Sequence, residues 1–223
     1  MKELQHILVT VDGSLTNKEG ELLCKLARNC NGNGVIVEIG SLKGRSTICM
    51  AKGSKSGNNV KIYAIDPHIE GSEHQFRKNI ENLEVSDIVI PLVKMSEEAA
   101  RDFKEPVELC FIDGAHDYES VKLDFDLWYP KLINHGVIAF HDTAVLEGPK
   151  RVVRNYVCRS RHFKNCGAVD TIVFAEKVES NSVIDRVRNR YIILLQTIYG
   201  LACRLHLPKP IKKCGRAILR VAQ

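Results

Sequence analysis

Short apolar runs recur along the chain, and segments with helically spaced apolar residues lie between them. The runs are rich in Val and Ile, do not alternate with polar residues, and span residues 35–39, 61–65, 88–93, 107–112 and 137–140. Strands buried on both faces, as in a parallel sheet, have this pattern. The intervening helix candidates span residues 20–29, 46–51, 73–83, 96–103 and 118–132. The alternation predicts an α/β fold with a doubly wound, mostly parallel sheet.

The end of the chain departs from this alternation. A helix candidate at 149–157 precedes two closing strands at 162–166 and 171–176, and an antiparallel last strand suits an otherwise parallel sheet. The composition changes near residues 178–182, so we predict one domain over residues 1–179 and a helical basic tail over residues 180–223. In the tail we expect a helix at 185–205, a break at Pro208 and Pro210, and a short basic amphipathic helix at 211–221.

Charge separates this tail from the domain. The chain has 223 residues, of which 44% are hydrophobic and 26% charged, a composition that excludes collagen-like and disordered classes. Residues 181–223 hold nine Lys or Arg and one acid, a net charge of +8; the remaining 23 bases and 26 acids leave −3 for residues 1–180. We expect the tail to dock on an anionic membrane surface. The alternatives are that its helix forms the interface of a homo-oligomer or covers the domain's own sheet.

Cysteine usage and the lack of a leader indicate the compartment. The eight cysteines form no C-x-x-C pair, and several lie in apolar runs, as expected of reduced thiols in a cytosolic protein. The first residues lack a long apolar core, and the longest apolar stretch, 191–203, is too short to span a membrane. We therefore expect a cytoplasmic protein, which the tail would bring to the inner membrane face. No nucleic-acid partner is expected, because the tail lacks interleaved aromatic and basic residues.

A glycine loop follows the first predicted strand. The pattern is Glu-x-Gly-x-x-x-Gly, from Glu38 to Gly44, and it fits neither a P-loop nor a dinucleotide fingerprint, which would need glycine at Leu42. An acid inside the strand suits a ligand that carries positive charge. Asp66 ends the second strand, where a carboxylate can accept hydrogen bonds from a ribose diol. A cationic ligand with a ribose indicates S-adenosylmethionine.

The motifs at 38–47, Asp66, 111–119 and 136–143 resemble those of class I S-adenosylmethionine-dependent methyltransferases. The closer resemblance, over roughly residues 15–177, is to small-molecule O-methyltransferases grouped with macrocin methyltransferase and cephalosporin-hydroxylase-like proteins. It implies a Rossmann-like, seven-stranded sheet with the cofactor at its carboxyl edge. The residues implied to bind the cofactor are Glu38, Gly40, Ser41, Gly44, Arg45 and Ser46 for the amino-acid half, Asp66, Pro67 and His68 for the ribose, Met95 and Ser96 for the adenine, and Asp113.

Polar residues at the ends of the fourth and fifth strands are candidates for the chemistry. Asp113 ends the fourth strand, His116 follows it, and His141 and Asp142 end the fifth. In one interpretation Asp113, Asp142 and a histidine such as His141 bind Mg²⁺ or another divalent cation, which activates the acceptor hydroxyl. Catechol methyltransferase-like enzymes have Asp-Asn where this chain has His-Asp, and imidazole favours a transition metal. In the other, His116 or His141 is the general base, oriented by Asp113 or Asp142. We favour His116.

Together these features predict an O-methyltransferase. The expected acceptor is a hydroxyl on a sugar, glycan or secondary metabolite, and the expected reaction is an in-line methyl transfer assisted by a histidine base or a divalent metal. One alternative is a nonenzymatic domain that binds S-adenosylmethionine. Another is a nicotinamide-dependent oxidoreductase, which Leu42 and Glu38 disfavour.

Overall fold

Seven strands form one sheet in the computed structural model, which describes residues 2–205. Their order is β3-β2-β1-β4-β5-β7-β6. The first five strands are parallel, and β7 is antiparallel to both β5 and β6, as predicted. The strands are β1 Val35–Ile39, β2 Ile62–Ile65, β3 Val89–Leu92, β4 Val107–Ile112, β5 Leu132–Phe140, β6 Phe163–Val169 and β7 Ile172–Lys177.

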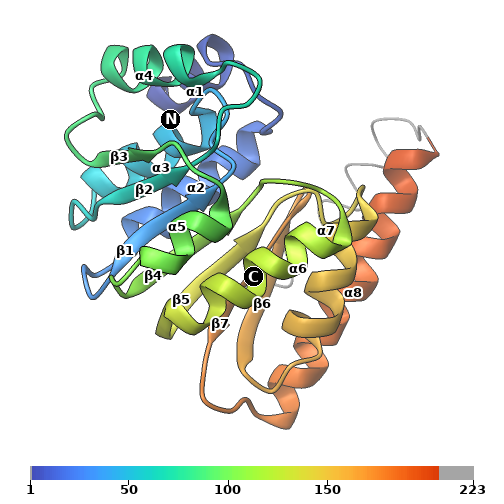
Figure 1. Ribbon diagram of the computed structural model, residues 1–223. Helices are drawn as coiled ribbons and strands as arrows, with labels where there is room; N and C mark the ends of the chain where they lie inside the picture. Colours follow the sequence, from blue (N-terminus) through green and yellow to red (C-terminus); the bar gives the residue numbers. More distant parts are fainter. Residues whose placement is uncertain (1, 206–223) are drawn as a thin grey trace.

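Helices cover both faces of this sheet (Figure 1). One hydrophobic core contains residues of α1 Lys2–Thr10, α2 Asn17–Arg28, α3 Arg45–Lys55 and α4 Glu73–Asn82. The other contains residues of α5 Ser96–Asp102, α6 Tyr118–Trp128, α7 Glu147–Val152, the π-helix η2 Val153–Cys158 and α8 Val183–Arg204. Neighbouring residues of β1 serve different cores, since Ile36 packs in the first and Val37 in the second. This two-sided burial explains the unbroken apolar runs.

Several predicted boundaries were wrong. The helix expected at 118–132 ends at Trp128, because Pro130 cannot continue it, and a short 3₁₀ turn, η1 Tyr129–Lys131, follows. Strand β5 then begins at Leu132, five residues before the predicted start, and pairs with Val107 of β4. The helix expected at 149–157 begins at Glu147 and continues as η2. Helix α1 was not predicted.

The helix predicted for the tail is present as α8, which is capped by a reciprocal pair of hydrogen bonds between Ser182 and Asp185. It runs along the outer side of the molecule, coloured orange to red in Figure 1, and packs on β6 and η2. Ile192, Leu195 and Tyr199 are buried in that contact. The break and short helix expected at 206–221 lie outside the described residues. Within residues 2–205, no helix has the length and apolarity that a membrane span requires.

Candidate functional site

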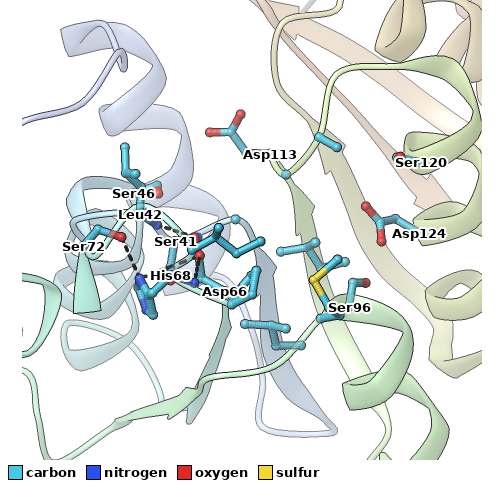
Figure 2. Close-up of a pocket in the computed structure, with 18 of the residues that line it drawn as sticks. Ser41, Leu42, Ser46, Asp66, His68, Ser72, Ser96, Asp113, Ser120 and Asp124 are labelled. Atoms are coloured by element: carbon cyan, nitrogen blue, oxygen red, sulfur yellow. Dashed lines mark hydrogen bonds and ion pairs between the residues drawn. The ribbon is translucent and has the colours of Figure 1, made fainter.

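A cavity of about 870 Å³ opens at the carboxyl edge of the sheet. Figure 2 shows Asp66 on one side of it and Ser96 and Asp124 on the other. Most residues that the sequence analysis proposed line this cavity: Gly40, Ser41, Arg45, Ser46, Asp66, Pro67, His68, Met95, Ser96, Asp113, His116 and Asp142. Glu38, Gly44 and His141 do not. The fold thus gathers residues from β1, β2, β4 and β5 around one space, as expected where parallel strands end together.

Asp66 holds the glycine loop in place. The backbone N–H groups of Ser41 and Leu42 donate to its Oδ2 atom at 3.0 and 2.8 Å, and that of His68 donates to Oδ1 at 2.7 Å. Leu42 adopts a left-handed backbone, with φ of 45°, which turns consecutive amides toward one acceptor. The His68 ring is itself tied to the Ser72 hydroxyl at 2.8 Å. Asp66 therefore organises the loop and also borders the cavity.

Gly40 makes the junction of two strand ends possible. Its φ is 86°, and a Cβ atom on it would lie 2.2 Å from the backbone oxygen of Asp113. Any larger residue would push the end of β1 away from the end of β4. Gly44 has a similar φ of 88° and is the N-cap residue of helix α3. It faces the Phe76 ring and does not border the cavity.

Glu38 lies beneath the loop and is fully buried, because strand alternation directs it toward α3. The Thr47 hydroxyl donates to its Oε2 atom, while Oε1 has no hydrogen-bond partner among the described residues. Burial raises the pKa of Glu38 to about 8. The buried Ser41 hydroxyl also lacks a partner there. An ammonium and a carboxylate at this loop would satisfy both groups, so the loop fits the amino-acid half of S-adenosylmethionine.

Arg45, which the resemblance implied to contact the cofactor, also binds the protein's own backbone. Its guanidinium donates to the backbone oxygens of Val11 and Leu15, with Nε and Nη1 at 2.5 and 3.2 Å respectively. These bonds hold the connection between α1 and α2 over the glycine loop. The side chain still borders the cavity, but its donors are committed to the protein's own backbone.

The opposite wall contains an acid that the sequence analysis missed. Asp124 is buried on α6 and borders the cavity, and burial raises its pKa to about 6. Nearby, the Trp128 indole donates to the Ser96 hydroxyl at 2.9 Å. The sequence did contain a signal for Asp124, because its position falls on the same face of the helix as the buried residues Val121, Phe125 and Trp128. An acid at a core position of an amphipathic helix is uncommon without a partner or ligand.

Two histidines lie beside the carboxylates at the ends of β4 and β5. His116 is half-exposed, and its Nε2 atom lies 3.2 Å from Oδ2 of Asp142. The Asp142 carboxylate, which accepts a hydrogen bond from this ring, raises the pKa of His116. The backbone of Asp142 is left-handed, with φ of 58°. Gly148 lets helix α7 pack closely against the loop between β4 and α6, because a Cβ atom on Gly148 would lie 2.1 Å from the backbone oxygen of His116.

His141 is placed differently from the prediction. Only 3% of its side chain is exposed, so it does not reach the cavity as a catalytic group would. Its Nδ1 atom lies 3.1 Å from Asp113 and 3.4 Å from Asp142, and its Nε2 atom lies 3.6 Å from Glu19. Burial opposes charge on the ring, but these three carboxylates together raise its pKa well above the ordinary value. His141 thus lies buried among three carboxylates, two of which border the cavity or its edge.

Glu19 is the second residue that the sequence analysis missed. It belongs to α2, is buried, and accepts hydrogen bonds from the Thr16 backbone and from both the backbone and hydroxyl of Thr171. Burial would raise its pKa, but His141 and Thr171 hold it well below the usual range. The sequence contains a helix-capping signal at Thr16 and Glu19, and nothing in that signal indicates a contact with β5 or β7.

The predicted metal ligands also come together. Asp113, His141 and Asp142 each offer one donor atom, and these atoms lie within 4.8 Å of one another. Two carboxylates and one imidazole suit a divalent cation. His141 can act as a metal ligand through Nδ1 only when that atom carries no proton.

Comparisons with known proteins agree with this arrangement. Residues 37–143 match the family model described as a methyltransferase domain. A curated relative, the uncharacterized protein y4gI of Sinorhizobium fredii, is 34% identical over 122 residues, which are 50% of this chain and 13% of the relative. The chain therefore covers far less than two thirds of that relative's length.

Two solved structures share the fold. An O-methyltransferase from Bacillus cereus, in complex with SAH, has a TM-score of 0.60 and 19% identity, with 79% of this chain and 91% of that chain covered. TomG from Streptomyces achromogenes, an O-methyltransferase of tomaymycin synthesis in complex with SAM, has a TM-score of 0.60 and 16% identity, with 80% and 90% covered. Residues 37–143 thus resemble a methyltransferase domain, and the sheet around them has the fold of these two O-methyltransferases.

Proposed function

We propose that the protein transfers a methyl group from S-adenosylmethionine to a hydroxyl oxygen of a small-molecule or glycan acceptor. The observation that carries this proposal is the pairing of His116 with Asp142 on the wall of the cavity that also contains the glycine loop and Asp66. A candidate base and a candidate cofactor loop therefore border one space. The solved O-methyltransferases with the same fold support the choice of oxygen as the acceptor atom.

His116 would act as the general base. A neutral imidazole has one donor and one acceptor nitrogen, so when Nε2–H donates to Asp142, Nδ1 accepts a proton. S-adenosylmethionine supplies a methyl group activated by positively charged sulfur. As the acceptor oxygen bonds to the methyl carbon and the carbon–sulfur bond breaks, the hydroxyl proton passes to Nδ1. Asp142 then stabilises the imidazolium, as a carboxylate does beside a catalytic histidine.

Binding would be divided along the cavity. Ser41, Ser46 and the loop amides would hold the amino-acid half, with Glu38 beneath them, and Asp66 would face the ribose. Met95 and Ser96 would border the adenine. Asp124, on the same wall as Ser96, would offer a carboxyl group to a polar edge of the ligand.

Calorimetry and a transfer assay test the proposal. The full chain is titrated with S-adenosylhomocysteine and separately with NAD, and binding of the first alone is expected. The chain is then incubated with methyl-labelled S-adenosylmethionine and a panel of sugars, sugar nucleotides and catechols. A mass increase of one methyl group on an acceptor supports the proposal. Binding of NAD without S-adenosylhomocysteine contradicts it, and cofactor binding without transfer to any hydroxyl would favour a nonenzymatic binding domain.

A metal-assisted reaction is the second candidate, favoured by the convergence of Asp113, His141 and Asp142. The two carboxylates and Nδ1 of His141 would hold the ion, which would lower the pKa of the acceptor hydroxyl. Dialysis against EDTA, followed by addition of Mg²⁺ or Mn²⁺, separates the candidates. Full activity after dialysis supports the base-only reaction. Loss and recovery of activity, together with calorimetric metal binding that Asp142→Asn abolishes, supports the metal.

A further inference from the structure

Helix α8 has a second apolar face, which the domain does not cover. Its large apolar side chains include eight that are exposed by 44% to 68%: Val183, Ile184, Val187, Tyr191, Leu194, Ile198, Leu201 and Leu205. The opposite face packs on the sheet through Ile192, Leu195 and Tyr199. At 3.6 residues per turn, these two sets lie on different sides of the helix. Within the described residues, this is an apolar stripe that runs the length of a 22-residue helix.

The spacing of the stripe is that of a helix–helix seam. From Ile184 to Leu205 the exposed residues follow each other at intervals of three, four, three, four, three and four. This is a heptad pattern sustained over three repeats, with Ile184, Tyr191, Ile198 and Leu205 at one core position and Val187, Leu194 and Leu201 at the other. Two of the four residues at the first position are isoleucine and two of the three at the second are leucine, a combination that favours two-stranded assemblies in parallel coiled coils.

The stripe is unlike a face that lies in a membrane surface. A strict two-in-seven stripe is the narrow seam of a coiled coil, whereas an interfacial helix has a broad apolar face and a charged face toward water. On α8 the side opposite the stripe is packed against β6 and η2, so it cannot be that solvated face. The exposed Arg188 and Arg190 flank the stripe near its start, and the next two turns carry no charge.

The exposed area suits a dimer. Eight large side chains, each about half exposed, present on the order of 800 Å² of surface, similar to the ~800 Å² that each partner buries in a standard protein interface. Monomeric proteins rarely expose a continuous apolar patch of this size. We propose that the partner is a second copy of this chain, whose α8 packs against the first through the same stripe in a two-fold dimer. No described residue of α8 lines the cavity, so the seam is separate from the candidate site.

Sedimentation velocity of the full chain at 1–100 µM tests the proposal. A species of twice the chain mass of 25.1 kDa is expected for the wild type. The double variant Leu194→Glu/Leu201→Glu should sediment as a monomer and should bind S-adenosylhomocysteine as the wild type does. Val9→Glu is the matched control, because Val9 is an exposed apolar residue of another helix and should leave the dimer intact. If the charged variant does not fold, Leu194→Ala/Leu201→Ala keeps helix propensity and should raise the dimer Kd at least tenfold.

Three outcomes would overturn the proposal. A wild-type chain that stays monomeric at 100 µM excludes the dimer, whether or not another segment covers the stripe. A monomer that co-sediments with phosphatidylglycerol–phosphatidylcholine vesicles, and loses that binding in the Glu variant, assigns the stripe to a lipid surface. A dimer that persists in both stripe variants assigns the interface to another part of the chain.

Discussion

The Nε2 atom of His141 lies 3.6 Å from the Oε2 atom of Glu19, which joins helix α2 to the end of strand β5. Through Nδ1 the same ring reaches Asp113 and Asp142, the two carboxylates at the ends of β4 and β5. Glu19 lies outside residues 37–143, which match the methyltransferase domain model. A residue of the N-terminal segment therefore helps to position the residues proposed for chemistry.

Replacing Glu19 tests this link. Glu19→Gln keeps the size of the side chain but removes the charge that faces His141, so the free energy of unfolding should fall by about 1–3 kcal/mol, the usual cost of leaving a buried polar group without its partner. Urea denaturation measures this change. Glu21→Gln, an exposed substitution on the same helix, should leave stability within about 0.5 kcal/mol of the wild type. Equal stability of both variants would show that the Glu19–His141 contact is energetically neutral.

His116 is expected to be needed for turnover and not for cofactor binding. His116→Gln retains polar bulk but no base, and kcat for methyl transfer should fall about 10²- to 10⁴-fold. The affinity for S-adenosylhomocysteine, measured by calorimetry, should change little. His74→Gln is the control, because His74 is exposed on α4 and does not line the cavity. A kcat that His116→Gln leaves unchanged would exclude this residue as the base.

The pH dependence of the reaction should depend on Asp142. This carboxylate raises the pKa of His116, so the basic form of the imidazole accumulates only at higher pH than for an ordinary histidine. Asp142→Asn removes that effect, and the rising limb of the kcat–pH profile should move toward lower pH while kcat decreases. Initial rates between pH 5 and 9 measure both effects. A limb that stays in place would mean that another group controls it.

Glu38 should make stability depend on pH. Its pKa is about 8 when folded and near 4.5 when exposed, so the folded chain holds a proton that the unfolded chain releases between these values. The free energy of unfolding should therefore decrease as pH rises from about 4.5 to 8, by up to ~1.4 kcal/mol per pH unit. Glu38→Gln should flatten this slope. Urea denaturation at pH 5, 6.5 and 8 compares the two proteins, and equal slopes would contradict the buried proton.

The core strands could be predicted because burial on both faces leaves a direct record in the sequence. β1 and β4 have the predicted bounds, and α8 differs from its prediction by two residues at one end and one at the other. The end of α6 and the start of β5 could not be placed from the sequence. Pro130 ends the helix early, and pairing with β4 and β7 extends β5 over residues whose own pattern does not indicate a strand. Helix α1 carries too short an apolar pattern to be separated from a loop.

For the candidate site, spacing identified the residues that follow strands and missed those that arrive from helices. Gly40, Asp66 and Asp113 stand at strand ends, where the topology brings them to one edge. Glu19 and Asp124 come from helices, and their approach to the cavity depends on how those helices pack.

The sequence by itself determined the α/β alternation, the glycine loop with its acid in the strand, the carboxylates after β2, β4 and β5, and the concentration of positive charge at the end. These follow from local burial and from short spacings along the chain. The tertiary structure alone decided that His141 is buried among three carboxylates while His116 faces the cavity, and that α8 covers the sheet with one face and exposes the other. The reason is that strand alternation and helix packing set the direction of a side chain, and that direction depends on contacts between segments far apart in the sequence.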